Sequence, residues 1–564
     1  MASNIRYEDR PWTAHYDRGV PEKLNYEPIS LPDYLAKSSQ KFPERTALIC
    51  EGFKITYRQL NEMVNRLATC LKEFGIQKGD RVAILLPNLI PCVVSYYAIL
   101  KIGAITVMNN PAASDSELQY QLSDSGAKII ITVDLLVNRI TALGLNTDLK
   151  HIIYATLGDY LPLTKRISLA LLAKSKKMAT KLKSTENIFR WKELMADFAP
   201  EPGQNSVALE DIAQLQYTGG TTGVSKGVML SHGNLSSQIQ QINAWFPTFA
   251  QSDEVVLGAL PFFHSFGLTC AMNNAVFAGW GNILVPNPSV ENLLAAIQKF
   301  KPTFLPLVPS MYSSLANHPD IKKIDLTSTK GCFSGSAPLP VDVIRRFEAL
   351  TGAAISEGFG LTEASPITHA NPFQGRRKVG SVGLPFPDTE CRIVDLHDGV
   401  TNVPVGETGE LIVKGPQIMK GYWKKPEETA LVLREGWLYT GDIARMDPEG
   451  YFYIVDRKKD MIICAGYNVY PREVDEVIYG HPKVQEACAI GIPHAIKGEQ
   501  VKVFVVLKPG ESLTEENLID FCKDKLAGYK LPAQVEFRNE LPTSAVGKIL
   551  RKDLRDEELK KLRL

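Results

Sequence analysis

Residues 217–227 read Tyr-Thr-Gly-Gly-Thr-Thr-Gly-Val-Ser-Lys-Gly, and this stretch is the strongest local signal in the chain. Its four glycines and five hydroxyl-bearing residues surround a single lysine, Lys226. Glycines allow a close backbone approach, N–H and O–H groups donate to an anion, and the lysine adds positive charge. Apolar residues, Ile212 and Leu215, precede the loop, and 228–230 follow it, which is typical of a buried strand. The stretch therefore predicts a phosphate-binding loop; a surface loop rich in Gly, Ser and Thr is the alternative.

This loop differs from the Walker A loop, which has glycine immediately before its lysine, whereas Ser225 stands there in this chain. We expect its backbone and hydroxyl groups to contact phosphate together with the Lys226 ammonium. The residues expected to do so are Thr218, Gly219, Gly220, Thr221, Thr222, Gly223 and Ser225.

The sequence on the amino-terminal side of the loop alternates between helical and strand patterns. Thr56 can cap a helix over 57–74, in which apolar residues recur at helical spacing. Alternation of this kind indicates a largely parallel sheet covered by helices, an α/β fold. The further expected elements are strands at 81–86, 104–107 and 128–132 and a helix at 93–102.

The carboxyl-terminal part of the chain has its own pattern. Residues 467–477 read as a loop that leads into a helix with Pro471 in its first turn, 501–506 reads as a strand, and a second helix begins near 513–516. We place a domain boundary at Asp456, which gives an N-terminal body over 1–456 and a small α+β domain over 457–564.

Composition excludes several classes of protein. The 564 residues include 63 Lys and Arg against 62 Asp and Glu, so no strong field attracts nucleic acid, and we expect no nucleic-acid partner. With 45% apolar residues the chain is not intrinsically disordered. The nine cysteines are scattered without a C-x-x-C pair, and the N-terminus lacks an apolar signal core, so we expect a reducing, cytoplasmic location.

Three segments bear on membranes. Residues 82–100 and 255–290 carry no charge, but Pro, Asn and Gly interrupt them, so we interpret them as buried strands and helices. Residues 160–185 contain no acidic residue and place lysines opposite an apolar face. This basic amphipathic pattern predicts peripheral contact with an anionic membrane surface; a solvated surface helix is the alternative.

The loop at 217–227 resembles the phosphate-binding signature of the adenylate-forming superfamily, which includes acyl-CoA synthetases, peptide-synthetase adenylation domains and luciferases. Four further segments match that superfamily in order, and the resemblance covers about residues 31–556. It is nearest to the bacterial long-chain fatty acid:CoA ligases, and it implies a large body with mixed and parallel sheets plus a small, mobile C-terminal domain. The matching segments are 335–340, 357–363, 436–442 and 541–551.

The resemblance implies a role for each matched residue. Thr362 would hydrogen-bond phosphate, Glu363 would hold Mg²⁺, and Asp442 would accept hydrogen bonds from the ribose hydroxyls. Arg457 would reach the ribose or phosphate, and Lys548 would bridge the substrate carboxylate and the α-phosphate. The catalytic set implied is Lys548, Thr362, Glu363 and Lys226, and the other implied ATP or AMP contacts are Gly335, Ser336, Ala337, Pro338, Glu357, Gly358, Phe359, Gly360 and Ile454.

The resemblance also implies which residues form the hinge, the coenzyme A passage and the acyl pocket. Asp456 would be the pivot about which the C-terminal domain rotates between two half-reactions, and Gly466 would line the pantetheine tunnel. The acyl pocket would involve His264, Phe266 and Gly267, with a hydrogen-bonded core histidine as the alternative for His264.

The acid itself is expected to be apolar. No carboxylate lies between Glu254 and Glu291 to pair with a substrate amine, so an amino acid is disfavoured. A long uncharged tunnel favours a long chain, because each buried CH₂ contributes about 0.8 kcal/mol. We therefore predict ATP- and Mg²⁺-dependent ligation of a long-chain fatty acid to coenzyme A through an acyl-adenylate, releasing AMP and pyrophosphate. A medium-chain or aryl acid:CoA ligase and a non-catalytic fatty-acid-binding relative are the alternatives. The sequence leaves the oligomeric state open between a monomer and a homodimer.

Overall fold

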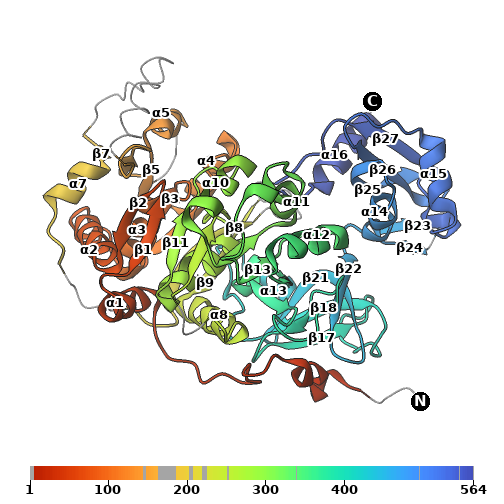
Figure 1. Cartoon of the computed structure of the whole chain (residues 1–564), viewed down its shortest axis with the longest axis horizontal. Helices are drawn as coiled ribbons and strands as arrows, with labels where there is room; N and C mark the ends of the chain where they lie inside the picture. Colours follow the sequence, from red (N-terminus) through yellow and green to blue (C-terminus); the bar gives the residue numbers. More distant parts are fainter. Residues whose placement is uncertain are drawn as a thin grey trace. The chain divides into compact units, whose positions relative to one another are not determined.

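The computed structural model describes residues 5–143, 148–162, 186–201, 207–218, 225–249, 253–337, 339–465, 467–494, 496–544 and 547–562. Tertiary contacts divide the chain into two compact units (Figure 1). The larger unit comprises Thr13–Glu390 with Lys414–Leu438. The smaller unit comprises Met1–Trp12, Cys391–Val413 and Tyr439–Leu564.

The larger unit contains an eight-stranded sheet in the order β19-β9-β8-β4-β3-β5-β6-β7. Its strands from β8 to β7 pair in parallel, whereas β9 is antiparallel to β8 and β19 is antiparallel to β9. The strands are β3 (Arg81–Leu85), β4 (Ile105–Met108), β5 (Ile129–Val133), β6 (His151–Ala155), β7 (Ile188–Arg190), β8 (Ile212–Thr218), β9 (Lys226–Ser231) and β19 (Gly421–Tyr422).

A second, nine-stranded sheet of the larger unit has the order β16-β15-β14-β13-β12-β10-β11-β1-β2. Its interior strands are parallel, and antiparallel pairs lie at both ends. The strands are β1 (Thr46–Cys50), β2 (Phe53–Thr56), β10 (Val255–Gly258), β11 (Gly281–Leu284), β12 (Phe304–Leu307), β13 (Gly331–Ser334), β14 (Ile355–Gly360), β15 (Ile367–Ala370) and β16 (Leu384–Pro385).

The two helices that the sequence pattern predicts in the larger unit, at 57–74 and 93–102, are both present as α2 and α3. Helix α2 (Tyr57–Glu73) begins after Thr56, whose hydroxyl accepts a hydrogen bond from the Gln59 amide, while the Gln59 side-chain oxygen accepts one from the Thr56 amide. The other helices are α1 (Leu31–Lys41), α3 (Ile90–Lys101), α4 (Asp115–Ser125), α5 (Asp134–Ala142), α7 (Trp191–Asp197), α8 (His232–Trp245), α9 (Asn274–Ala278), α10 (Val290–Phe300), α11 (Pro309–Asn317), α12 (Val341–Thr351) and α13 (Pro426–Val432).

The two uncharged segments are buried, as predicted. Residues 82–100 form most of β3 and α3, and every residue of α3 except the last is buried. Residues 255–290 form β10, a π-helical turn (Gly267–Asn273), α9 and β11. Across the described ranges, we find no helix with the length and apolar character needed to span a bilayer. The predicted amphipathic helix over 160–185 falls almost wholly on residues outside those ranges.

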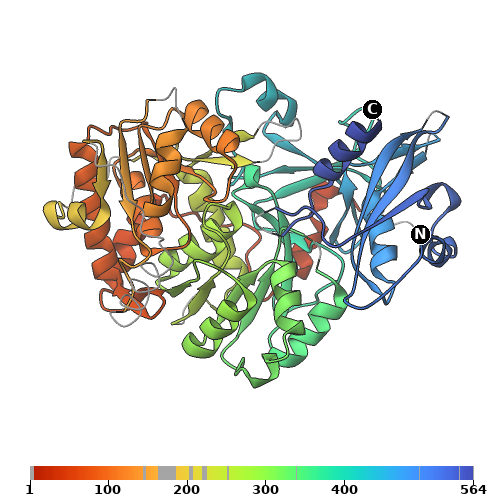
Figure 2. The same ribbon diagram turned by 90° about the horizontal axis from the view of Figure 1, so that it is seen from above.

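The smaller unit contains two sheets. One holds β17 (Glu390–Val394), β18 (Gly409–Lys414), β21 (Trp437–Met446) and β22 (Phe452–Arg457), whereas the two-residue strand β20 (Leu433–Arg434) belongs to the larger unit. The other holds β23 (Ile462–Cys464), β24 (Tyr467–Val469), β25 (Val484–His494), β26 (Gly498–Leu507) and β27 (Gln534–Arg538). Figure 2 shows this second sheet with its helices, α14 (Pro471–Tyr479), α15 (Glu515–Lys523) and α16 (Arg551–Leu562).

The C-terminal α+β core agrees with the sequence-based expectation in most details. Pro471 opens α14, and α15 begins after Thr514, which caps it. Val474, Ile478 and Leu518 from these helices are buried against the sheet. Residues 467–469 form a strand rather than the expected loop, because they pair with β23. The α/β fold with a small α+β domain is thus confirmed; the boundary at Asp456 stays a prediction.

Candidate active site

The predicted phosphate loop connects two antiparallel strands. Thr218 ends β8 and Lys226 begins β9, and the two residues lie directly opposite each other. The predicted phosphate contacts from Gly219 to Gly223 lie outside the described residues. The Ser225 hydroxyl is buried and has no hydrogen-bond partner within the described part of the chain. A buried hydroxyl without a partner is costly, so this position suits an oxygen-rich ligand.

Strand β19 fixes the surroundings of Lys226. It pairs with β9, which sets Tyr422 opposite Val228. The Lys226 ammonium lies 5.0 Å from the centre of the Tyr422 ring and forms an ion pair with Glu428 of α13. Lys226 is therefore held by residues that lie about two hundred positions away along the chain.

Glu363 lies in a short 3₁₀ turn (Thr362–Ala364) and shares Tyr422 with Lys226. Its backbone carbonyl accepts a hydrogen bond from the Met419 amide, and the Tyr422 hydroxyl donates to its Oε1 atom over 2.8 Å. Burial and the Glu363 charge raise the pKa of Tyr422, so this hydroxyl keeps its proton and remains a donor. The other oxygen, Oε2, accepts no hydrogen bond from a described residue.

This arrangement fits a magnesium ion bound mainly by phosphate. Within the described ranges there is no cluster of three or more His, Cys, Asp or Glu side chains that could form an all-protein metal site. Mg²⁺ commonly uses one or two carboxylates together with substrate phosphates and water. Glu363 offers one such carboxylate oxygen, and Lys226 contacts the same tyrosine.

The segment 335–340, which holds implied ATP or AMP contacts, is hydrogen-bonded to the strand that carries the 357–363 motif. The Glu357 carboxylate accepts a hydrogen bond from the Leu339 amide over 3.2 Å. Gly360 has no room for a side chain, because an added Cβ would lie 1.9 Å from the Pro366 carbonyl oxygen. Ser336 adopts a left-handed conformation with φ 74°. Gly335, Ala337, Gly358 and Phe359 lie in these two segments, and Pro338 lies outside the described residues.

The expected acyl segment contacts both nucleotide segments. Ser265 and Thr362 have hydroxyl oxygens 3.3 Å apart, and an added Cβ on Gly335 would lie 3.3 Å from the Phe266 ring. At Gly267 an added Cβ would lie 2.4 Å from the Pro261 carbonyl oxygen, so glycine is required there. His264 is half-buried, and its Nδ1 atom accepts a hydrogen bond from the Phe266 amide over 3.3 Å.

The smaller unit brings together a second group of predicted residues. In the β21–β22 hairpin, Asp442 lies opposite Arg457, and Arg457 Nε is 3.5 Å from Asp442 Oδ1. Asp442 is buried, whereas nearly half of the Arg457 side chain is exposed. Ile454 lies on the same strand as Arg457, opposite Ala444.

Lys548 lies in a tight turn that its neighbours define. The Lys548 amide donates to the Ser544 hydroxyl over 3.1 Å, and Gly547 takes a left-handed φ of 71°, which favours glycine. Burial, together with the charge of Arg457, lowers the pKa of the Lys548 ammonium to about 8, and the charge of Asp442 partly offsets that shift. Lys548, Arg457 and Asp442 therefore share one electrostatic environment within this unit.

Asp456, the predicted hinge residue, is buried and capped by backbone. Its carboxylate accepts hydrogen bonds from the Arg457 and Arg472 amides, each over 2.7 Å. Burial raises its pKa. The Arg472 amide belongs to the first turn of α14, so the predicted hinge is attached directly to that helix. Gly466, the expected CoA contact, lies outside the described part of the chain.

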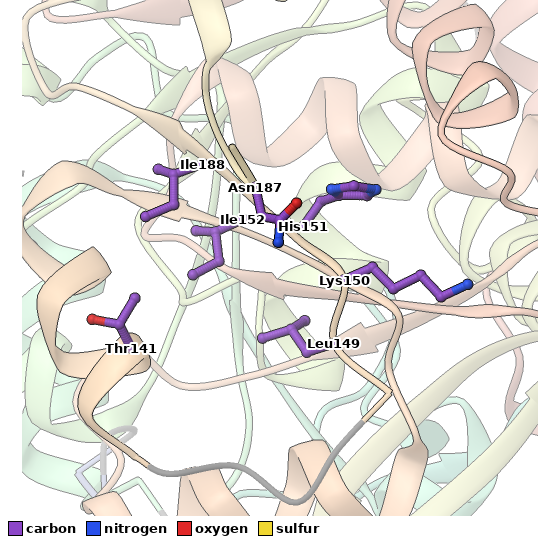
Figure 3. Close-up of a pocket in the computed structure, with 7 residues that line it drawn as sticks. All are labelled: Thr141, Leu149, Lys150, His151, Ile152, Asn187 and Ile188. Carbon is purple, nitrogen blue, oxygen red and sulfur yellow. The ribbon is translucent and has the colours of Figure 1, made fainter. Parts of the chain in front are cut away.

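A small cavity of about 160 Å³ lies elsewhere in the larger unit (Figure 3). Its lining includes His151 and Ile152 of β6 and Ile188 of β7. These strands form the edge of the eight-stranded sheet opposite to β9 and β19. None of the predicted site residues lines this cavity, so it is separate from the candidate site.

Sequence reasoning missed Tyr422 and Glu428. Both lie in the stretch Gly-Tyr-Trp-Lys-Lys-Pro-Glu-Glu over 421–428, which has no phosphate-like or metal-like pattern. Their contacts with the predicted site residues depend on the pairing of β19 with β9, which no local pattern predicts.

Comparisons with known proteins identify the family to which the chain belongs. The AMP-binding enzyme family matches residues 35–423, and the AMP-binding enzyme C-terminal domain matches residues 473–548. A long-chain-fatty-acid–CoA ligase of Bacillus subtilis (strain 168) is 45% identical over 553 residues, which cover 97% of this chain and 98% of that protein.

Two similar solved structures contain a bound nucleotide or acyl-adenylate. ATP-bound MatB from Rhodopseudomonas palustris is 30% identical with a TM-score of 0.78, covering 94% of this chain and 99% of that chain. An anthranilate CoA ligase in complex with anthranoyl-AMP is 27% identical with a TM-score of 0.82, covering 99% of this chain and all of that one. The chain belongs to the AMP-binding enzyme family, which confirms the resemblance to adenylate-forming enzymes.

Proposed function

We propose that this protein is an AMP-forming long-chain fatty acid:CoA ligase, which uses ATP, Mg²⁺ and coenzyme A and releases AMP and pyrophosphate. The 3.3 Å approach of the Ser265 and Thr362 hydroxyls carries this proposal, because it joins the uncharged acyl segment to the nucleotide segment. The Bacillus subtilis relative, a long-chain-fatty-acid–CoA ligase, supports the choice of acid.

The first half-reaction activates the acid. A carboxylate is a poor acyl donor, because its charge repels nucleophiles and oxide is a poor leaving group. The carboxylate oxygen attacks the α-phosphate of ATP, and pyrophosphate leaves with the electrons of the broken bond. Positioning and charge neutralisation contribute most to such a step. Lys226 and the Ser225 hydroxyl bind the β- and γ-phosphates, and Lys548 stabilises the charge that develops between carboxylate and α-phosphate.

Other side chains orient the nucleotide. Asp442 accepts hydrogen bonds from the ribose hydroxyls, and Arg457 neutralises phosphate or contacts the ribose. Thr362 donates to the phosphate, and Glu363 holds Mg²⁺, which supplies positive charge to the phosphate oxygens when bound.

The second half-reaction transfers the acyl group to a thiol. The CoA sulfur attacks the acyl carbon, and AMP leaves as the anion. Lys548 has no role in this step and would occupy the place that the thiol needs. We therefore propose that the C-terminal domain, residues 457–564, rotates about Asp456 between the two half-reactions. Gly466 then lines the pantetheine passage, where a side chain would obstruct a narrow channel.

The substrate class is tested by pyrophosphate release over a panel of acids. We expect kcat/KM to rise with aliphatic chain length, by up to about fourfold per CH₂, until the apolar pocket is filled. Aryl and short-chain acids serve as the comparison set. A maximum at benzoate-like acids or at short chains would assign the chain to the aryl or medium-chain alternative, and no release with any acid would favour a non-catalytic relative.

We further propose that the protein is cytoplasmic and contacts the inner face of the membrane through 160–185. Lys174, Lys176 and Lys177 would be attracted to anionic lipid by about 1 kcal/mol each. Changing all three to Glu should abolish most co-sedimentation with anionic liposomes at low salt.

A matched control uses three lysines elsewhere with exposed side chains, Lys72, Lys322 and Lys323. Their replacement by Glu makes the same change of charge, so it separates local contact from overall attraction. Equal losses in the two triple variants would argue against a specific membrane segment.

A further inference from the structure

The ion pair between Lys226 and Glu428 has no part in the chemistry described so far. Lys226 begins β9, and β19 lies antiparallel to it. Helix α13 follows β19 after a short turn and places Glu428 beside the lysine. The two side chains are 13% and 31% exposed, so solvent screens this pair less than a fully exposed one.

The charge state of the pair follows from its contacts. The ion pair with the Lys226 ammonium lowers the pKa of Glu428, so the carboxylate is ionised at neutral pH. A carboxylate and a phosphate oxygen are alternative anionic acceptors for the same ammonium donor. A ligand phosphate that approaches Lys226 therefore meets both an attractive ammonium and a repulsive carboxylate.

Glu428 also has a second cation within reach. Lys425 Nζ lies 3.4 Å from Glu428 Oε1, three residues earlier on the chain. If Lys226 turns towards a phosphate, Glu428 keeps Lys425 as a partner and is not left as an uncompensated charge. The Tyr422 ring lies 5.0 Å from the Lys226 ammonium and gives it a favourable surface beside Glu428.

We propose that Glu428 is a positioning residue that holds Lys226 as an intramolecular counter-ion, and that the phosphates of ATP or pyrophosphate must compete with it for this lysine. The proposal rests on the proposed function, in which Lys226 binds the β- and γ-phosphates. By competing for the same ammonium, Glu428 weakens the binding of both ligands and so speeds the release of pyrophosphate after adenylation.

The test measures binding of Mg²⁺–pyrophosphate and Mg²⁺–ATP to the full-length protein by calorimetry, with the ATP KM and kcat measured in parallel. Glu428→Gln should bind both ligands about two- to fivefold more tightly and lower the ATP KM by a similar factor. Glu427→Gln is the matched control, because Glu427 is an exposed carboxylate on the same helix. This control should bind both ligands like the unmodified protein.

A double-variant cycle separates competition for Lys226 from general repulsion. In a Lys226→Met background, Glu428→Gln should no longer tighten pyrophosphate binding. Equal tightening in both backgrounds, or unchanged or weaker binding by the single Glu428→Gln variant, would overturn the proposal. If Lys226→Met alone binds both ligands normally, the phosphate-binding role of Lys226 itself fails, which is a separate result. Thermal unfolding midpoints identify any variant that has lost its fold.

Discussion

Replacing Lys548 by alanine should slow acyl-adenylate formation on the order of a hundred- to a thousandfold, and largely spare thioester formation from supplied acyl-adenylate. The reason is that the Lys548 ammonium is proposed to stabilise charge on the carboxylate and the α-phosphate only in the first half-reaction. Pyrophosphate release measures the first step, and acyl-CoA formation from synthetic acyl-adenylate measures the second.

The pKa of Lys548 supplies an independent check of this role. Because burial lowers the pKa to about 8, the ammonium is charged below that pH and loses its proton as the pH rises through it. Adenylation by the unmodified protein should therefore decline above about pH 8. A Lys548→Arg variant keeps its charge at high pH and should not show this decline, whatever its absolute rate. Equal loss of both half-reactions in Lys548→Ala would contradict the assignment.

Replacing Glu363 by glutamine should lower the adenylation rate by about a hundredfold and raise the Mg²⁺ concentration needed for half-maximal rate. Glutamine keeps the shape and the hydrogen bond from Tyr422 but removes the negative charge, and Mg²⁺ prefers carboxylate oxygen. The measurement is a Mg²⁺ titration of pyrophosphate release at saturating ATP.

Tyr422→Phe is the graded control for this experiment. It removes only the hydroxyl that donates to Glu363, so we expect a smaller rise in the Mg²⁺ requirement, about threefold to tenfold. An unchanged Mg²⁺ requirement in Glu363→Gln, with a normal unfolding midpoint, would show that Glu363 does not hold the metal.

Local elements of the fold were predictable because their causes are local. Helix α2 starts where Thr56 caps it, and α14 starts at Pro471, since each signal acts within one helical turn. The strand at 467–469 was not predictable in the same way. It is short and exists because β23 supplies its hydrogen-bond partners, so its pattern alone resembles a loop.

The residues of the candidate site also differ in whether local sequence or long-range contacts reveal them. Sequence reasoning predicted binding or catalytic roles for Lys226, Glu363, Asp442 and Lys548, because each lies in a motif that resembles a signature of the adenylate-forming superfamily. It could not identify Glu428, because the contact with Lys226 spans about two hundred residues and depends on the β9–β19 register. A shift of one residue in that register would turn each side chain to the other face of the sheet.

The sequence by itself determined the α/β alternation and the uncharged character of the acyl segment, because these properties depend on the type and spacing of neighbouring residues. Its motifs also predicted, through their resemblance to the adenylate-forming superfamily, which side chains bind phosphate, metal and ribose. The tertiary structure alone decided which of these side chains meet. The Asp442–Arg457 pair and the tyrosine shared by Lys226 and Glu363 arise from strand register and from contacts between distant segments. The same is true of the environment that lowers the pKa of Lys548, because its charge neighbours come from a strand hairpin about a hundred residues earlier.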